Sequence, residues 1–238
     1  MDYLKNVQAV TQRLQPGPQS DAESDASAPV TLIAASKSRS PDQIRAMYEA
    51  GVTHFGENYL DEALEKMPLL ADLPLQWHYI GRIQSNKTKD IAEHFHWVHT
   101  VDREKIARRL SDQCPPGRSL QILIQVNIDA DPAKGGILEH NLNALLECMV
   151  DLPNLDLRGL MTILANDTER APVESYRSMA QLLASAGTLF GGRLPAWDTL
   201  SMGMSRDLEA AVASGATMVR VGTDLFGPRP PKQPVADL

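Results

Sequence analysis

The sequence predicts an α/β protein that forms a single closed barrel of eight parallel strands alternating with helices. Two observations lead to this fold class. From residue 30 onward, short β-like runs alternate with helical stretches, which is the pattern of parallel strands joined by crossover helices. The chain has 238 residues, a length that (β/α)8, or TIM, barrels commonly reach as one domain. An open, doubly wound sheet is the competing fold, but no GxGxxG sequence follows the first strand.

The individual elements are predicted from the same patterns. Strands are expected at residues 30–35, 53–55, 76–80, 97–100, 120–126, 157–160, 198–200 and 218–221. Helices are expected between them, near residues 41–50, 59–67, 87–94, 103–110, 138–150, 172–186 and 206–214. The first of these helices has a clear start signal, because Ser40 can cap the helix and Pro41 suits its first turn.

Three segments flank the predicted barrel, which spans residues 30–227. Apolar residues at helical spacing predict that residues 1–14 form an extra N-terminal helix packed on the barrel. Residues 15–29 are rich in Pro, Ser, Asp and Ala, and they cannot bury enough apolar area to offset their ordering entropy, so we expect a flexible loop. The Pro-rich residues 228–238 are expected to form an extended tail.

Composition argues against several classes of partner. The formal net charge is −7, whereas nucleic acids and anionic membranes are bound chiefly through clustered Lys and Arg. The start of the chain lacks the apolar stretch of a signal peptide, and no run approaches transmembrane length. Cys114 and Cys148 lie outside any CxxC spacing, which predicts neither a disulfide scaffold nor a metal site. We expect a cytoplasmic protein that binds no metal, nucleic acid or membrane.

The end of the first predicted strand offers a candidate nucleophile. Active sites in these barrels lie at the C-terminal ends of the strands, and Lys37 directly follows the apolar run LIAAS. Partial desolvation at the barrel mouth would make its amine reactive toward a carbonyl group, as a Schiff base requires. Taken alone, a lysine after a strand is more often a solvated loop residue.

The loops after the seventh and eighth strands are suited to a phosphate group, which such barrels frequently bind there. The first loop offers the hydroxyls of Ser201 and Ser205, and it contains Gly203, which permits close approach to the backbone. The second loop offers Gly222 and Thr223. For each loop, an ordinary turn with a helix cap is the alternative.

Arg220 is expected to point into the barrel. Strand alternation places it on one face with Met218, while Val219 and Val221 share the other face and suit packing against helices. A guanidinium inside the barrel needs hydrogen-bond acceptors, since burying it unpaired is costly. A structural ion pair inside the barrel is the alternative to a role in ligand binding.

Seven stretches of this sequence resemble a known family. They are AASK (34–37), HFGEN (54–58), WHYIGRIQSNK (77–87), LIQVNI (123–128), RGLMT (158–162), LSMGMSRDLEAAVASGATMVRVGT (200–223) and FGPR (226–229). Through them the chain closely resembles the YggS/PROSC family of pyridoxal-phosphate homeostasis proteins over roughly residues 30–229. The fold of that family is similar to the N-terminal barrel of alanine racemase.

The resemblance implies that the cofactor is pyridoxal 5′-phosphate (PLP), held as a Schiff base on Lys37. It also implies which residues hold the phosphate: Ser201, Gly203, Gly222 and Thr223. Arg220 matches the family's arginine near the pyridine nitrogen, which would keep that nitrogen unprotonated and restrict carbanion chemistry.

Two further residues, Asn58 and His78, match family positions at the barrel mouth and are expected to contact the cofactor. The sequence also departs from the family's commoner pattern. This sequence has AASK where the commoner pattern is AVSK, GRIQSNK where it is GHLQSNK, and KGGI (134–137) where it is KSGF. These changes leave Lys37 in place, but they put accessory contacts near Arg82 and Gly135 in doubt.

The resemblance favours a cofactor carrier over an enzyme. Alanine racemases use a second base, a tyrosine from a further domain, and the residues after Val221 are too few to form one. The remaining candidate bases are Tyr59, Tyr79 and His78, each of which has a simpler role in packing or capping. We expect storage and supply of PLP without robust turnover and with no catalytic residue.

A PLP-dependent, racemase-like enzyme is the main alternative, and a sugar-binding barrel that uses Glu57 as acid–base is a weaker one. Expected partners are PLP itself and the apo forms of PLP-dependent enzymes. We expect a monomer or weak dimer, because no apolar stripe demands a partner.

Overall fold

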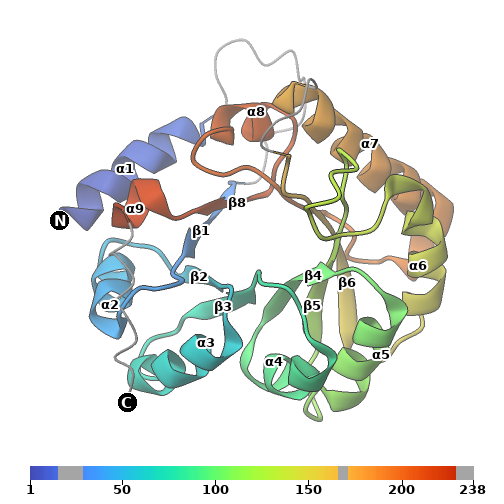
Figure 1. Cartoon of the computed structure of the whole chain (residues 1–238), viewed down its shortest axis with the longest axis horizontal. Helices are drawn as coiled ribbons and strands as arrows, with labels where there is room; N and C mark the ends of the chain where they lie inside the picture. The colour runs from blue at the N-terminus through green and yellow to red at the C-terminus, as the bar shows by residue number, and fades with distance from the viewer. Residues whose placement is uncertain (16–28, 166–170, 229–238) are drawn as a thin grey trace.

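The computed structural model confirms the predicted fold class (Figure 1). It describes residues 1–15, 29–165 and 171–228. Eight parallel strands pair in chain order, and β8 pairs with β1 to close the barrel. The strands are β1 Thr31–Ala35, β2 His54–Glu57, β3 Gln76–Tyr79, β4 Trp97–Val101, β5 Leu120–Gln125, β6 Leu155–Met161, β7 Thr199–Ser201 and β8 Met218–Val221.

Helices surround the strands as an outer ring (Figure 1). They are α1 Tyr3–Arg13, α2 Pro41–Glu49, α3 Leu60–Lys66, α4 Thr88–His94, α5 Glu104–Gln113, α6 Leu142–Met149, α7 Pro172–Phe190, α8 Leu208–Ala213 and α9 Thr223–Phe226. Short 3₁₀ helices cover Met67–Leu70, Ser85–Lys87, Glu139–Asn141 and Gly191–Arg193. The expected start of α2 is present: the Ser40 side chain accepts a hydrogen bond from the Gln43 amide, and the Gln43 side chain accepts one from the Ser40 amide.

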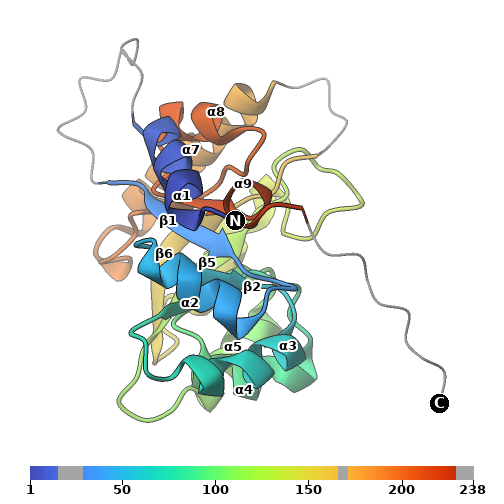
Figure 2. The same ribbon diagram turned by 90° about the vertical axis from the view of Figure 1, so that its left-hand side faces the viewer.

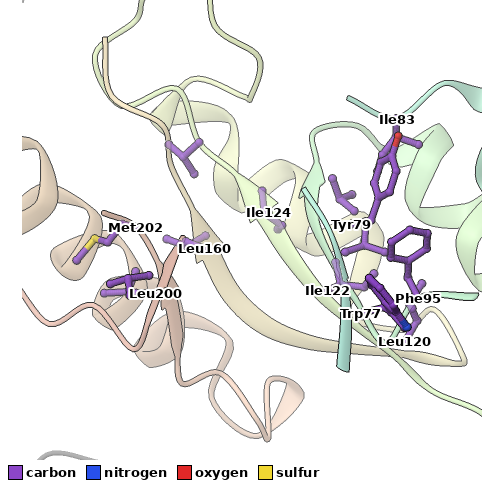
Figure 3. Packing of buried hydrophobic residues seen from close by; sticks show 14 of the residues in the cluster. Trp77, Tyr79, Ile83, Phe95, Leu120, Ile122, Ile124, Leu160, Leu200 and Met202 are labelled. Atoms are coloured by element: carbon purple, nitrogen blue, oxygen red, sulfur yellow. The ribbon is translucent and has the colours of Figure 1, made fainter. Parts of the chain in front are cut away.

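The core has an inner and an outer layer, as the alternation of side chains along each strand requires. The inner layer is small and fills the barrel with Ile33, Trp97, Leu123, Met161 and Met218. The outer layer lies between strands and helices, and Figure 3 shows part of it. There Tyr79 of β3 packs edge-on against Phe95, with ring centroids 5.2 Å apart. A barrel packed in this way leaves only its ends open for a ligand.

The N-terminal helix α1 lies on the outside of the barrel beside α9 (Figures 1 and 2). Val10 of α1 belongs to the buried core, and the Asn6 side chain donates a hydrogen bond of 2.8 Å to the carbonyl of Leu225 in α9. Arg13 forms ion pairs with Glu209 of α8 and Asp224 of α9. The helix therefore covers the segment that follows β8.

Several element boundaries differ from the predictions. Helix α9 was not predicted, because its four residues are too few to show a period. Helix α7 continues four residues beyond its expected end at residue 186 and stops before Gly191, which has a positive φ of 50°. Most of the expected loop 15–29 and tail 228–238 lies outside the described residues. Among the helices of the described part, none is both long and apolar enough to cross a membrane.

Candidate functional site

Lys37 lies in the turn that follows β1, at the C-terminal end of the barrel strands, and it is half-buried. Along β1, Ile33 belongs to the inner core and Ala34 to the outer core. Continuing this alternation places Lys37 on the inner side, at the barrel mouth. The next residue, Ser38, has a positive φ of 60°, a conformation that non-glycine residues seldom adopt. The turn that carries Lys37 is therefore held in an uncommon backbone shape.

Gly222 directly follows β8, the strand that pairs with β1. Its φ of −116° and ψ of −70° lie at the edge of the right-handed α region and not in the left-handed region, so backbone conformation does not by itself require glycine here. A Cβ at this position would meet only Ala35, at 3.5–3.6 Å, so packing does not require glycine either. The missing side chain leaves space at the mouth beside the strand that leads to Lys37. Thr223, the first residue of α9, is exposed next to this space.

Gly203 has a different structural reason to be glycine. Its φ is +93°, and a Cβ would lie 2.5 Å from the Cβ of Ala211 in α8. Both the backbone and the close approach of α8 exclude a side chain. The carbonyl of Gly203 accepts a hydrogen bond of 3.0 Å from the amide of Arg220, which ties this loop to β8.

Arg220 lies inside the barrel and is only 5% exposed. Its guanidinium donates hydrogen bonds to the Ser201 hydroxyl at 2.6 Å and to the Thr162 carbonyl at 2.7 Å. Burial lowers the pKa of this group to about 10, so it stays cationic at neutral pH. Among the described residues no carboxylate forms an ion pair with Arg220, which argues against the structural ion pair considered from the sequence.

Ser201 and three histidines form a hydrogen-bonded row across the barrel. The Ser201 Oγ lies 2.9 Å from His99 Nδ1, His99 Nε2 lies 2.9 Å from His78 Nδ1, and His78 Nε2 lies 2.9 Å from His54 Nδ1. Burial is the main cause that lowers the pKa of His78 and of His99 well below its usual value. These two rings are therefore neutral at physiological pH.

His78 thus lies inside the barrel, not at the mouth where we expected it. Its ring is fully buried, stacks on Trp97 at 5.6 Å between centroids, and uses both nitrogens within the row. The sequence motif identified the residue but not its depth, because barrel stagger sets the height of each strand. Within the row, His78 is linked to Ser201 through His99.

Asn58 follows β2 at the same end of the barrel as Lys37. Its side-chain amide donates a weak hydrogen bond of 3.5 Å to the carbonyl of Ile80, while its Oδ1 is buried and has no partner in the described structure. Buried polar atoms nearly always have a partner, so this oxygen is a feature that a ligand at the mouth would explain.

Glu57 does not face the mouth, which removes the main candidate acid–base of the sugar-binding alternative. It points outward to α3, where its Oε1 accepts hydrogen bonds from the Ser36 hydroxyl at 2.6 Å and from Lys66 at 2.7 Å. Burial is the leading influence that raises the pKa of Glu57, and Lys66 opposes it. The partnership with Lys66 was missed from the sequence, although the spacing of Glu62 and Lys66 is typical of a helical ion pair.

Among the described residues, no group of three or more His, Cys, Asp or Glu side chains is arranged to hold a metal ion. In the described part of the chain, Cys114 and Cys148 are both free thiols. The chemistry available at the mouth is that of an amine, a buried cation, backbone groups and hydroxyls.

Comparison with known proteins identifies close relatives. The family described as "Alanine racemase, N-terminal domain" matches residues 24–230. The chain is 48% identical over 227 residues to the pyridoxal phosphate homeostasis protein of Pseudomonas aeruginosa, with 94% of this chain and 95% of the relative covered. It is 45% identical over 205 residues to the protein of the same name from Escherichia coli (strain K12), with 84% and 86% covered.

Solved structures of related proteins are also similar to this chain. PipY of Synechococcus elongatus PCC7942 without PLP is similar with a TM-score of 0.82 and 37% identity, covering 95% of this chain and 100% of PipY. PipY with PLP bound gives a TM-score of 0.80 and 36% identity over the same shares of both chains. Alanine racemase from Corynebacterium glutamicum shares the fold, with a TM-score of 0.67 and 16% identity, covering 99% of this chain and 62% of the racemase.

Proposed function

The chain belongs to the alanine racemase N-terminal domain family and, within it, to the YggS/PROSC proteins, and on this basis we propose that it binds PLP and serves intracellular PLP homeostasis. One observation carries the proposal at the level of the site. Lys37 lies in the turn after β1, Gly222 follows the paired strand β8 and leaves space beside Ala35 of β1, and Arg220 is buried on the inner side of β8. An amine, an open backbone and a buried cation match the aldehyde, phosphate and pyridine ring of PLP.

In this proposal Lys37 holds the cofactor covalently. Its amine would hold the aldehyde of PLP as a Schiff base, a linkage that forms with loss of water and that water can reverse. A carrier needs this reversibility, because storage and supply are the two directions of one equilibrium.

The phosphate is assigned to the two loops predicted from the sequence. The open space at Gly222 lets a phosphate oxygen approach the backbone around Gly222 and Thr223. Gly203 shapes the neighbouring loop through its positive φ. Ser201 contributes less freely, because Arg220 already donates a hydrogen bond to its hydroxyl oxygen, which also lies at hydrogen-bond distance from His99.

Arg220 is assigned to the pyridine nitrogen of the cofactor. Two of its five N–H groups are used by Ser201 and Thr162, so donors remain for an acceptor at the mouth. A cationic guanidinium that donates to the pyridine nitrogen keeps that nitrogen unprotonated and weakens the ring as an electron sink. This chemistry and the homeostasis role of the curated relatives are the reasons to propose storage and supply of PLP rather than racemase-like turnover, and we propose that they take place in the cytoplasm. We propose that apo forms of PLP-dependent enzymes receive the cofactor, and that the carrier itself is a monomer or weak dimer.

The test of PLP binding is the visible spectrum of the purified protein supplied with PLP, followed by borohydride reduction and mass spectrometry of the intact chain. We expect a coloured protein that gains one reduced cofactor covalently, and a Lys37→Ala variant that gains none. Lys89→Ala, which removes an exposed lysine of α4, is the matched control and should behave as the wild type. A wild type that stays colourless and unmodified would refute the proposal.

The test of the carrier role is incubation of the PLP-loaded protein with L- and D-amino acids. We expect no change in chirality and no keto acid beyond the level of free PLP. Turnover at about 1 per second or faster, which is ordinary for an enzyme, would contradict the carrier role and favour the racemase-like alternative.

A further inference from the structure

A buried ion cluster lies on the outer side of β1 and β2, against α3. We call Glu57, Glu62 and Lys66 the Glu57 cluster. Lys66 is the last residue of α3, and its ammonium group lies 2.7 Å from Glu57 Oε1, 2.7 Å from Glu62 Oε1 and 3.1 Å from the carbonyl oxygen of Ser36. An ammonium group has three N–H donors, so each donor has an acceptor here. Glu57 and Lys66 are both buried, which makes the cluster costly to build for stability alone.

The cluster contacts the chain on both sides of Lys37. Before it, Ser36 donates its hydroxyl to Glu57 Oε1 at 2.6 Å and offers its carbonyl to Lys66. After it, the amide of Ser38 donates to Glu62 Oε1 at 2.6 Å. Two fixed neighbours leave the Cα–Cβ direction of the residue between them little freedom.

The backbone of the turn also needs such contacts. Ser38 has a φ of +60°, which costs free energy for a residue with a Cβ and persists only when the surroundings hold it. The hydrogen bond from the Ser38 amide to Glu62 acts at this residue. Glu62 is partly exposed, with 30% of its side-chain surface accessible, so it can be changed without opening the core.

We infer that the Glu57 cluster positions Lys37 for its covalent bond to PLP by fixing the backbone of Ser36 and Ser38 from the outer side of the barrel. This inference rests on the proposed binding of PLP at Lys37. Glu62 and Lys66 are positioning residues in it, and the decisive contact is the acceptor that Glu62 presents to the amide of Ser38. A glutamine at position 62 presents the same acceptor without the charge, whereas an alanine presents none.

The test compares Glu62→Ala, Glu62→Gln and Glu104→Ala. Glu104→Ala is the matched control, because Glu104 is a half-exposed helical carboxylate paired at the same i,i+4 spacing, with Arg108 in α5. Three readouts are taken: PLP affinity, the visible circular dichroism of bound PLP, and hydrogen exchange of the turn after β1 in the ligand-free protein. Thermal unfolding shows that each variant is folded.

We expect Glu62→Ala to weaken PLP binding about tenfold, the value of roughly one hydrogen bond, and to change the visible circular dichroism. Its turn should exchange faster in the ligand-free protein. Glu62→Gln and Glu104→Ala should stay within about twofold of the wild type, because each keeps the acceptor for Ser38.

Two results would overturn the inference. If Glu62→Ala bound PLP with wild-type affinity and an unchanged visible circular dichroism, the cluster would not position Lys37, while the proposed function would stand. If Glu62→Gln lost as much affinity as Glu62→Ala, the acceptor role would be wrong. A wild type that takes up no PLP would instead overturn the proposed function, and with it the role inferred for the cluster.

Discussion

Replacing Gly222 by alanine should separate stability from cofactor binding. The φ of −116° and ψ of −70° lie outside the left-handed region, and an alanine Cβ would meet only Ala35 at ordinary contact distance. The lower entropy of the unfolded alanine chain offsets the small backbone cost, so we expect the free energy of unfolding to change by less than about 1 kcal/mol. The methyl group would occupy the space assigned to the phosphate. Loss of one charge-assisted hydrogen bond there would weaken PLP binding by about 2 kcal/mol, or roughly 30-fold.

Two measurements check this prediction: denaturant unfolding of the ligand-free protein, and titration with PLP followed by tryptophan fluorescence. A clear fall in the free energy of unfolding would mean that glycine is needed for the fold at this position. Unchanged PLP affinity would mean that the phosphate does not lie against Gly222, and the assignment of this loop would then be wrong.

Two further predictions follow from the same structure. Gly203→Ala should lower the free energy of unfolding of the protein without PLP by about 2–5 kcal/mol, because alanine is strained at a positive φ and its Cβ would clash with Ala211. Denaturant unfolding measures this loss, and a loss below about 1 kcal/mol would contradict the geometry. Stability should also fall as the pH drops below about 6.5, because His78 and His99 have lowered pKa values in the fold but bind protons readily once unfolded. Between pH 7.5 and 5.5 each of these two histidines should lower the free energy of unfolding by on the order of 1 kcal/mol, and equal unfolding midpoints at both pH values would refute this prediction.

Strands such as β1, β5 and β8 could be predicted from the sequence because they are short, mostly apolar runs. The run 218–221, for example, matches β8 at both ends, and the run 97–100 misses only the last residue of β4. Local patterns fail where an element is too short to show a period, as in α9. They also fail where tertiary contacts extend an element, as in the last turn of α7, whose Phe190 is buried.

The candidate site could be predicted only in part. Positions after strand ends pointed to Lys37 and Gly222, because parallel strands bring those ends together. The row of His54, His78 and His99 could not be read in this way, since it depends on the stagger between neighbouring strands. The Glu57 cluster was equally hidden, because a helical pair such as Glu62 and Lys66 does not reveal which loop it contacts.

Sequence reasoning also gave Gly203 and Gly222 the same role, a close approach of backbone to phosphate. The structure separates them, since Gly203 is required by its own φ and by Ala211, whereas nothing in the fold requires Gly222. A glycine that the fold does not need is the better indicator of a ligand.

The row of hydrogen bonds limits what Ser201 can do at the phosphate. A guanidinium only donates, so the Ser201 oxygen accepts from Arg220 and has a single proton to give. His99 Nδ1 lies within reach of that proton and can accept it, while the other ring nitrogen of His99 donates to His78. If Ser201 instead donates to a phosphate, its hydrogen bond with His99 persists only if His99 Nδ1 carries the proton. We therefore expect the backbone around Gly222 to hold more of the phosphate than the Ser201 hydroxyl, which makes Gly222→Ala a sharper probe of this loop than Ser201→Ala.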